Sequence, residues 1–566
     1  MLSRLFVTSA LCLLIPLPAA AQEALVTLQQ RVLDNGVTVI VWERPSAGRV
    51  GTRMFYRVDV AAERPGTVGL THMLEHFLFK GSDVAGTTDW AAEKAIAERI
   101  EVLERQITDE KNRHRDCFRQ RDVFADVERD CRTPRLQTWQ AELDQAIETQ
   151  DRLSDPTWYD WAVQGAGGTN STASTGTDWM KFDIDLPASK LELFMWTERA
   201  RVERPVFRQF EAEREVVVNQ IRGSDNRPDG KFDRMLRSMT YEASPYGWSH
   251  WFSDLTRATR EDHWEIFHKY FIPQNAIIVV VGEVKADEVF RMAEAYWGSW
   301  QPGRPSPRLR TVEPPPVGER RLTVSAAAGP RIAINVPMPA IGHPDVAAFQ
   351  MLGEVLSGDN GLLAREVVTT RNIATSARAS GTPSKYPSHF SIRVDARGND
   401  DLPSAEAGID AVLRRVAAGE IAQTELEAAA GRLVLGMAQR LEEIGSAAVM
   451  IGAMESIHQA AYLNELPGLW RAVTAKDIAR IVSTYFAPDM RAVGILKREA
   501  SASTETASAV AAAPTATSAP AAAPAAAAWS SRPTLNDPQP AAASATARDV
   551  PAPPAEAQPE PLAIAE

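Results

Sequence analysis

The sequence predicts an α+β fold built from two homologous domains, and an internal repeat is the main reason. Tyr-Phe-Ile-Pro at 270–273 follows a helical pattern and precedes an apolar strand at 277–281. Tyr-Phe-Ala-Pro at 485–488 has the same setting, with a strand at 492–496 after it. A helix–strand unit that occurs twice indicates two copies of one mixed domain.

The repeat places one domain at 25–305 and a second at 317–500, joined by a proline-rich linker at 306–316. A charged helical stretch at 91–153 interrupts the first domain and is expected to form two antiparallel helices with a break near 116–134. We expect it to serve as a lid or partner-docking arm, or to be an inert surface hairpin. Residues 501–566 are rich in alanine and proline, which predicts a disordered tail.

The first 21 residues have the pattern of a signal peptide. Arg4 supplies a positive start, residues 11–17 form an apolar run, and three alanines at 19–21 suit a cleavage site. The run is too short to cross a bilayer, so no transmembrane segment is expected. The sequence therefore predicts export, most simply to a bacterial periplasm. The net charge of −12 argues against nucleic-acid binding.

Export would leave two cysteines, Cys117 and Cys131, in one polar segment. An oxidising compartment favours a local disulfide between them, and two free thiols are the alternative.

Smaller patterns predict the remaining elements. Asn35-Gly36 marks a turn before a strand at 37–41, because this dipeptide favours the positive φ angles of tight hairpins. Further apolar and charged periodicity predicts strands at 52–60 and 170–186 and helices at 68–80, 190–200 and 208–221.

The helix expected at 68–80 carries a His-x-x-Glu-His pattern, which we call the His-Glu-His motif: His72, Glu75 and His76. Residues three and four apart lie on one face of a helix, so both imidazoles and the carboxylate would point the same way. Two imidazoles suit zinc, and a nearby carboxylate suits a general base for water. Without such a metal, the three side chains would simply form a polar helix face.

The segment 351–356 has the same apolar spacing as 73–78, but Gln350, Gly353 and Glu354 take the positions of the motif residues. The second domain is therefore expected to lack the chemistry of the first.

The sequence resembles the pitrilysin, insulysin and mitochondrial processing peptidase family of inverted zincins, in its bacterial two-domain form. The resemblance rests on 33–36, 69–81, 167–174, 213–220, 225–228 and the Tyr-Phe-x-Pro repeats. It implies two domains of mainly antiparallel sheet packed with helices, which together form half of a peptidase chamber. It also implies a zinc metalloendopeptidase that hydrolyses peptides or unfolded segments, with one Zn²⁺ per chain held by His72 and His76 and with Glu75 activating water.

The resemblance extends to substrate binding and to a partner. Asn170, Ser171 and Thr172 match the edge strand that receives extended peptides in the family, although Asn170 would also suit a turn. Arg365 matches a transition-state arginine, while the family's tyrosine position is Thr375 here. Because two domains make half a chamber, a second subunit is implied, as a homodimer or heterodimer.

One position departs from the family pattern. The third zinc ligand of the family is a glutamate seven residues after the position of Glu213, and here that residue is Gln220. Gln220 could ligate weakly, or Glu213 or Glu215 could replace it. The third alternative is a catalytically weak or inactive subunit that acts in peptide binding or assembly.

Overall fold

The computed structural model describes residues 24–58, 62–114, 119–121, 126–128, 133–249 and 252–499, which belong to one compact unit. The predicted signal segment, Cys117, Cys131 and the predicted tail lie outside these residues. Within the described ranges, no helix combines the length and the apolar character needed to cross a membrane.

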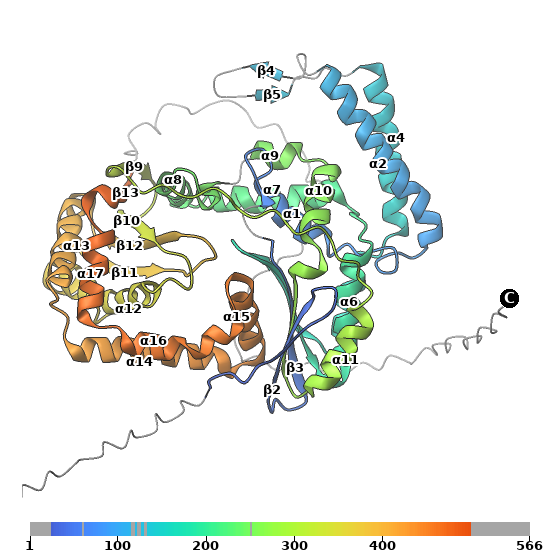
Figure 1. Cartoon of the computed structure of the whole chain (residues 1–566). Coiled ribbons are helices and arrows are strands. Elements are labelled where there is room, and N and C mark those ends of the chain that lie inside the picture. The colour runs from blue at the N-terminus through green and yellow to red at the C-terminus, as the bar shows by residue number, and fades with distance from the viewer. Residues whose placement is uncertain are drawn as a thin grey trace, which may run out of the picture. The chain divides into compact units, whose positions relative to one another are not determined.

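Two mixed sheets organise the chain, as the α+β prediction requires (Figure 1). The first has six strands in the order β1-β2-β8-β3-β7-β6. Their bounds are Gln29–Val32 (β1), Thr38–Glu43 (β2), Ala276–Gly282 (β8), Arg49–Tyr56 (β3), Met180–Pro187 (β7) and Thr169–Thr175 (β6). The second has five strands in the order β9-β13-β10-β12-β11. Their bounds are Arg320–Ala326 (β9), Ala492–Arg498 (β13), Arg331–Met338 (β10), Ser388–Ala396 (β12) and Ala374–Gly381 (β11).

Apart from the additional edge strand β1, the two sheets share one topology. In each, the strand that follows a Tyr-Phe-x-Pro segment (β8 or β13) pairs in parallel with one neighbour and antiparallel with the other. Two further antiparallel strands complete each sheet on the same side. The sequence repeat is thus a repeat of sheet topology. The domain boundaries near 305 and 317 stay a prediction.

The first sheet is covered by helices on both faces, which explains its apolar central strand. Ile277, Val279 and Val281 of β8 belong to a core shared with the second half of the chain, whereas Ile278 and Val280 belong to a core on the opposite face. A strand buried on both faces is expected to be continuously apolar. The helices packed with the opposite-face core include α1 (Leu70–Phe77), α6 (Leu191–Glu203), α7 (Phe210–Asp225), α10 (Arg260–Tyr270) and α11 (Ala286–Trp297).

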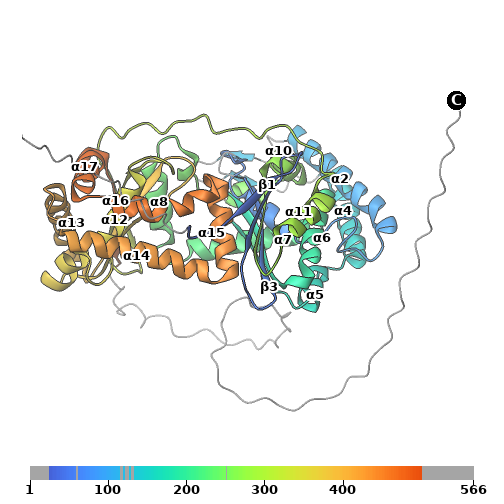
Figure 2. The ribbon, with the colours of Figure 1, turned by 60° about the horizontal axis from the view of Figure 1, so that its bottom comes forward.

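Helix α15 (Ile444–Ile457), from the second half, packs on β3 and β8 of the first sheet (Figure 2). Gly452 permits this contact, because a Cβ atom there would lie 2.2 Å from the ring of Phe55. The second sheet packs with helices of the second half: α12 (Val346–Leu356), α13 (Leu402–Ala417), α14 (Gln423–Glu442), α16 (Leu466–Ala472) and α17 (Ala475–Tyr485). Helix α8 (Gly230–Thr240), from the first half, packs against β9 and β13 of the same sheet.

The charged insertion forms the two antiparallel helices predicted for it, α2 (Trp90–Arg113) and α4 (Pro134–Leu153), which lie side by side (Figure 1). The short strands β4 (Arg119–Arg121) and β5 (Asp126–Glu128) lie between them in the chain. A buried ion pair fixes the base of the hairpin, because Arg208 Nε lies 2.7 Å from Glu93 Oε1 with both side chains at most 1% exposed. Gln150 donates to the same carboxylate.

Three sequence predictions need correction. The expected strand at 170–186 is two strands, β6 and β7, because Gly176 and Trp179 close a turn between them. The expected helix at 68–80 is shorter, since Gly69, with φ 101°, holds a left-handed conformation at its start and the last helical residue is Phe77. The strand expected at 52–60 begins earlier, and β3 ends at Tyr56.

Candidate active site

Two carboxylates hold the loop and the first turn before the His-Glu-His motif. Glu63 accepts a hydrogen bond from the backbone N–H of Thr71 at 3.0 Å and another from its hydroxyl. Asp254, in α9 (Phe252–Arg257), accepts from the backbone N–H groups of Gly66 and Val68 at 3.0 and 3.3 Å. Helix N-termini carry unpaired N–H groups and a partial positive charge, so these carboxylates stabilise the start of α1.

Helix α1 places all three motif residues near one another. The rings of His72 and His76 lie 5.2 Å apart between centroids and meet edge to face. Glu75 is 7% exposed and accepts a hydrogen bond from the hydroxyl of Thr175 in β6. Burial raises the pKa of Glu75 above its ordinary value, despite the opposing effects of Thr175 and His76. Carboxylates that act as general bases typically lie in a cavity and have a raised pKa.

A second helix holds His76 in place. Glu213 of α7 lies with Oε2 2.8 Å from His76 Nδ1, and its Oε1 is 2.6 Å from Lys80 Nζ. Burial acts to raise the pKa of Glu213, but the hydrogen bonds from His76 and Lys80 outweigh it and lower the pKa overall. A histidine that donates Nδ1–H to a carboxylate presents Nε2 as the nitrogen able to bind a metal.

Two residues of the site are suitable ligands for one zinc ion, the imidazoles of His72 and His76. Glu213 does not take a ligand position but orients the ring of His76 through a hydrogen bond. Gln220, two turns after Glu213 on α7, is exposed. No group of three or more His, Cys, Asp or Glu side chains suited to a metal occurs in the described part of the chain. The ligand set is therefore one carboxylate short of the usual three-ligand catalytic site.

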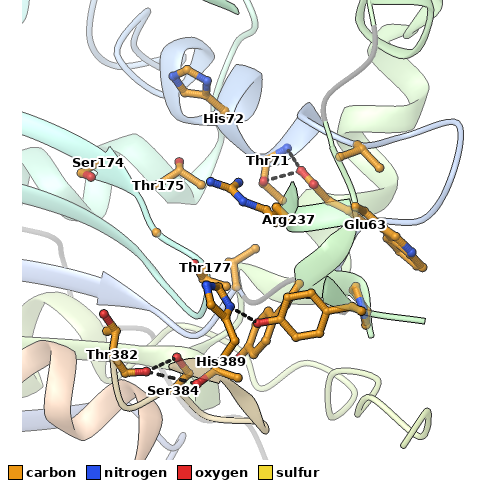
Figure 3. A pocket seen from close by; sticks show the side chains of 18 of the residues that line it. Glu63, Thr71, His72, Ser174, Thr175, Thr177, Arg237, Thr382, Ser384 and His389 are labelled. Carbon is orange, nitrogen blue, oxygen red and sulfur yellow. Dashed lines mark hydrogen bonds between the residues drawn. The ribbon is translucent and has the colours of Figure 1, made fainter. Parts of the chain in front are cut away.

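A cavity of about 730 Å³ opens beside the motif, and we call it the motif cavity (Figure 3). His72 and Glu75 line it from α1, and the end of β6 adds Ser174 and Thr175. Residues from the second sheet line it as well, so both halves of the chain form one cavity. A volume of this size is typical of ligand-binding sites.

The residues predicted for substrate binding lie at or near the same edge strand. Asn170 has a left-handed conformation, with φ 53°, and donates to Asp185 at 2.7 Å at a register shift between β6 and β7. Ser171 and Thr172 follow it in β6, but residues 173–177 are the ones that line the motif cavity. Arg365 forms an ion pair with Glu425 and is not among the lining residues.

Sequence reasoning missed several cavity residues from distant segments. Arg237 belongs to α8 (Gly230–Thr240), Tyr241 follows that helix, and His389 belongs to β12. The three lie more than 150 positions after the motif, and their sequence surroundings contain no motif that would have drawn attention to them.

Comparisons with known proteins agree with this architecture. Residues 257–433 match the model of the Peptidase M16 inactive domain. The chain is 24% identical over 351 residues to Zinc protease PqqE of Helicobacter pylori, covering 60% of this chain and 78% of that protein. Both matches point to the pitrilysin-like M16 peptidase family as the one that this chain resembles.

Solved structures with 21% identity or less show the same fold. A protease from Helicobacter pylori superposes with a TM-score of 0.67 at 21% identity, covering 83% of this chain and all of that one. The periplasmic protease PqqL of Escherichia coli gives 0.58 at 12% identity, over 83% of this chain and 47% of that one. The structure of the first half of PqqL alone gives a TM-score of 0.59 at 13% identity. This match covers 83% of this chain and 92% of that one. This chain thus corresponds in length to one half of such a protein.

Proposed function

We propose that this chain is a zinc-dependent endopeptidase subunit of the M16 family that cuts extended peptides held in the motif cavity. One observation carries the proposal: Glu75 and His72 line the same cavity as the end of edge strand β6, while Glu213 fixes the ring of His76. A general base, a metal-ligand pair and an unpaired sheet edge are among the parts that peptide hydrolysis by this family requires, and Gln220 stands at the position of the third ligand.

The edge strand would hold the substrate. Among the strands that the structure describes, β6 pairs only with β7, so its outer N–H and C=O groups are available to an extended peptide. Such β-augmentation orders the peptide backbone, and side-chain pockets then set the preference for sequence. Ser174 and Thr175 lie where this edge enters the cavity.

Glu75 would carry the protons. Its buried carboxylate takes a proton from the attacking water and returns it to the leaving amine, and its raised pKa suits both steps. His72 and His76 would hold one Zn²⁺, with Gln220 as a weak third ligand. When bound, zinc polarises the scissile carbonyl and lowers the pKa of the attacking water.

Export to the periplasm and pairing with a second M16-type subunit belong to the same proposal. The signal-like residues 1–21 and the periplasmic protease among the structural neighbours support export. The correspondence to one half of that neighbour supports a homodimer or heterodimer that closes the chamber.

A second function, peptide binding without efficient cleavage, is favoured by Gln220. A neutral amide is a weaker zinc ligand than a carboxylate, and the site then lacks one negative charge. The cavity and the edge strand would still bind extended peptides under this alternative.

Cleavage of a quenched-fluorescence peptide library separates the two functions. We expect the zinc-loaded chain to cleave members of the library, a chelator to stop cleavage, and Glu75→Gln to abolish it while peptide binding persists. Peptide binding with no cleavage by any zinc-loaded preparation, alone or with a partner subunit, would instead establish the binding function.

A further inference from the structure

The wall of the motif cavity that faces the motif is formed by α8, the residue after it, and the second sheet. We call its members Arg237, Tyr241 and His389 the donor wall. Arg237 lies in the last turn of α8 and Tyr241 directly follows that helix, and both line the cavity. Figure 3 shows the guanidinium group of Arg237 reaching between Thr71 and Thr175, toward the side on which His72 lies.

Arg237 differs from two charged neighbours on its helix. Arg234 lies 3.2 Å from Asp225, and Asp233 lies 2.9 Å from Arg393, so both are neutralised locally. Arg237 itself forms no ion pair with any residue that the structure describes. Its five N–H donors point into a cavity instead of toward a carboxylate of the protein.

The rest of the donor wall adds hydrogen-bonding capacity without charge. The Tyr241 hydroxyl lies 2.8 Å from His389 Nδ1. Burial, assisted by the nearby Arg237, lowers the pKa of His389 to about 4, so the ring is neutral at pH 7. The hydroxyls of Ser380, Ser388 and Ser391 line the same region. Arg237 is therefore the charge that the donor wall presents.

The acidic groups near the cavity are already engaged. Glu63 accepts two hydrogen bonds from Thr71, and Asp178 accepts from the hydroxyl of Tyr246 at 2.6 Å. Glu75, on α1, accepts a hydrogen bond from Thr175. An incoming carboxylate would thus meet an arginine and several hydroxyls on the side of α8 and β12.

We infer that the donor wall binds a carboxylate of the peptide substrate, with Arg237 as the residue that determines this specificity. The inference rests on the proposed function, because it assumes that the motif cavity holds a peptide. The carboxylate is either the C-terminal group of a short peptide or the side chain of an internal Asp or Glu. Arginine suits either source, since its planar guanidinium binds carboxylates through two parallel hydrogen bonds.

Binding of four matched peptides tests the inference. They share one sequence and differ in having a free or amidated C-terminus, and in carrying Glu or Gln at one internal position. Affinities are measured by fluorescence anisotropy with the full chain carrying Glu75→Gln, so that no peptide is cut. We expect one carboxylate, terminal or internal, to tighten binding about tenfold, which corresponds to about 1.4 kcal/mol, because charge-assisted hydrogen bonds to arginine are stronger than neutral ones.

Variants on the same background assign the effect to Arg237. Arg237→Met should remove the preference for the carboxylate, and Arg237→Lys should retain part of it as a point charge. Arg414→Met, an exposed position on α13, is the matched control for a lost positive charge and should keep the full preference. Equal affinities for all four peptides, or a preference that survives in Arg237→Met, would overturn the inference.

The two proposals fail in different ways in this experiment. If none of the four peptides binds, the proposed peptide-binding function fails, and the inference fails with it. If the peptides bind with equal affinity, only the carboxylate preference is refuted. If circular dichroism shows that Arg237→Met does not fold, the four peptides still test the carboxylate preference. The Arg237→Lys variant then tests whether Arg237 is its source.

Discussion

His263 is predicted to make the stability of the chain fall steeply in mild acid. Its side chain is fully buried in α10, directly behind the motif helix, with its ring edge-on to Phe77 at 5.0 Å and to Phe210 at 5.3 Å between centroids. Nδ1 lies 2.8 Å from the carbonyl oxygen of Thr259. Burial lowers the pKa of His263 from 6.5 to about 4, because a charged imidazolium would lose its hydration there.

The sign and the size follow from proton linkage. Below pH 6.5 the unfolded chain binds a proton at this histidine and the folded chain does not, so acid favours unfolding. The stability that neutral His263 contributes is complete above pH 6.5 and is lost as the pH falls toward 4. A shift of this size, at about 1.4 kcal/mol per pH unit, corresponds to roughly 3 kcal/mol over that window.

Urea unfolding of the wild type and His263→Asn at several pH values between 7.5 and 4.5 measures the effect. Asparagine is neutral at every pH in this range. Its packing defect therefore lowers the free energy of unfolding by a constant amount, and the pH-dependent contribution of His263 disappears. We expect the free energy of unfolding of the wild type to fall more steeply below pH 6.5 than that of His263→Asn. His268→Asn, an exposed position on the same helix, should keep the wild-type slope. Parallel slopes for the wild type and His263→Asn would refute the reasoning.

Three other substitutions have expected outcomes. Glu213→Gln should weaken zinc binding about 10–100-fold in calorimetric titration, because His76 loses its carboxylate partner. Glu211→Gln, on the same helix, should leave zinc binding unchanged. Equal zinc affinities of the two variants would contradict the role of Glu213. Gln220→Glu should tighten zinc binding, and no change would mean that another group already ligates. Glu93→Gln leaves a buried arginine without its counter-charge and should cost about 3–5 kcal/mol in chemical denaturation; a cost below about 1 kcal/mol would contradict that ion pair.

Local patterns in the sequence predicted much of the fold, because they reflect local physics. The Asn35-Gly36 turn, the two helices of the insertion and the repeated helix–strand unit all depend on neighbouring residues. The pattern does not predict the turn between β6 and β7, because the polar run before it and the apolar run after it together resemble one strand. Its signal was present in the glycine and aspartate at 176 and 178.

The site could be predicted only in part. The motif residues share one helix turn, so their proximity follows from spacing alone. The contact between Glu213 and His76 needs the packing of α1 against α7, which spacing does not fix. Arg237 and His389 come to the same cavity only because α8 and β12 meet through long-range packing, and no pattern near either residue indicates it.

The central claim is that the His-Glu-His motif supports zinc-dependent peptide cleavage although Gln220 occupies the expected third-ligand position. Titrating Zn²⁺ into the chelated chain while following cleavage of a peptide tests it most directly. The account predicts that activity returns and saturates at one zinc per chain, and that His72→Ala never recovers it. The claim would be contradicted if the wild type showed no cleavage at any zinc concentration. It would also be contradicted if zinc restored the activity of His72→Ala as fully as that of the wild type.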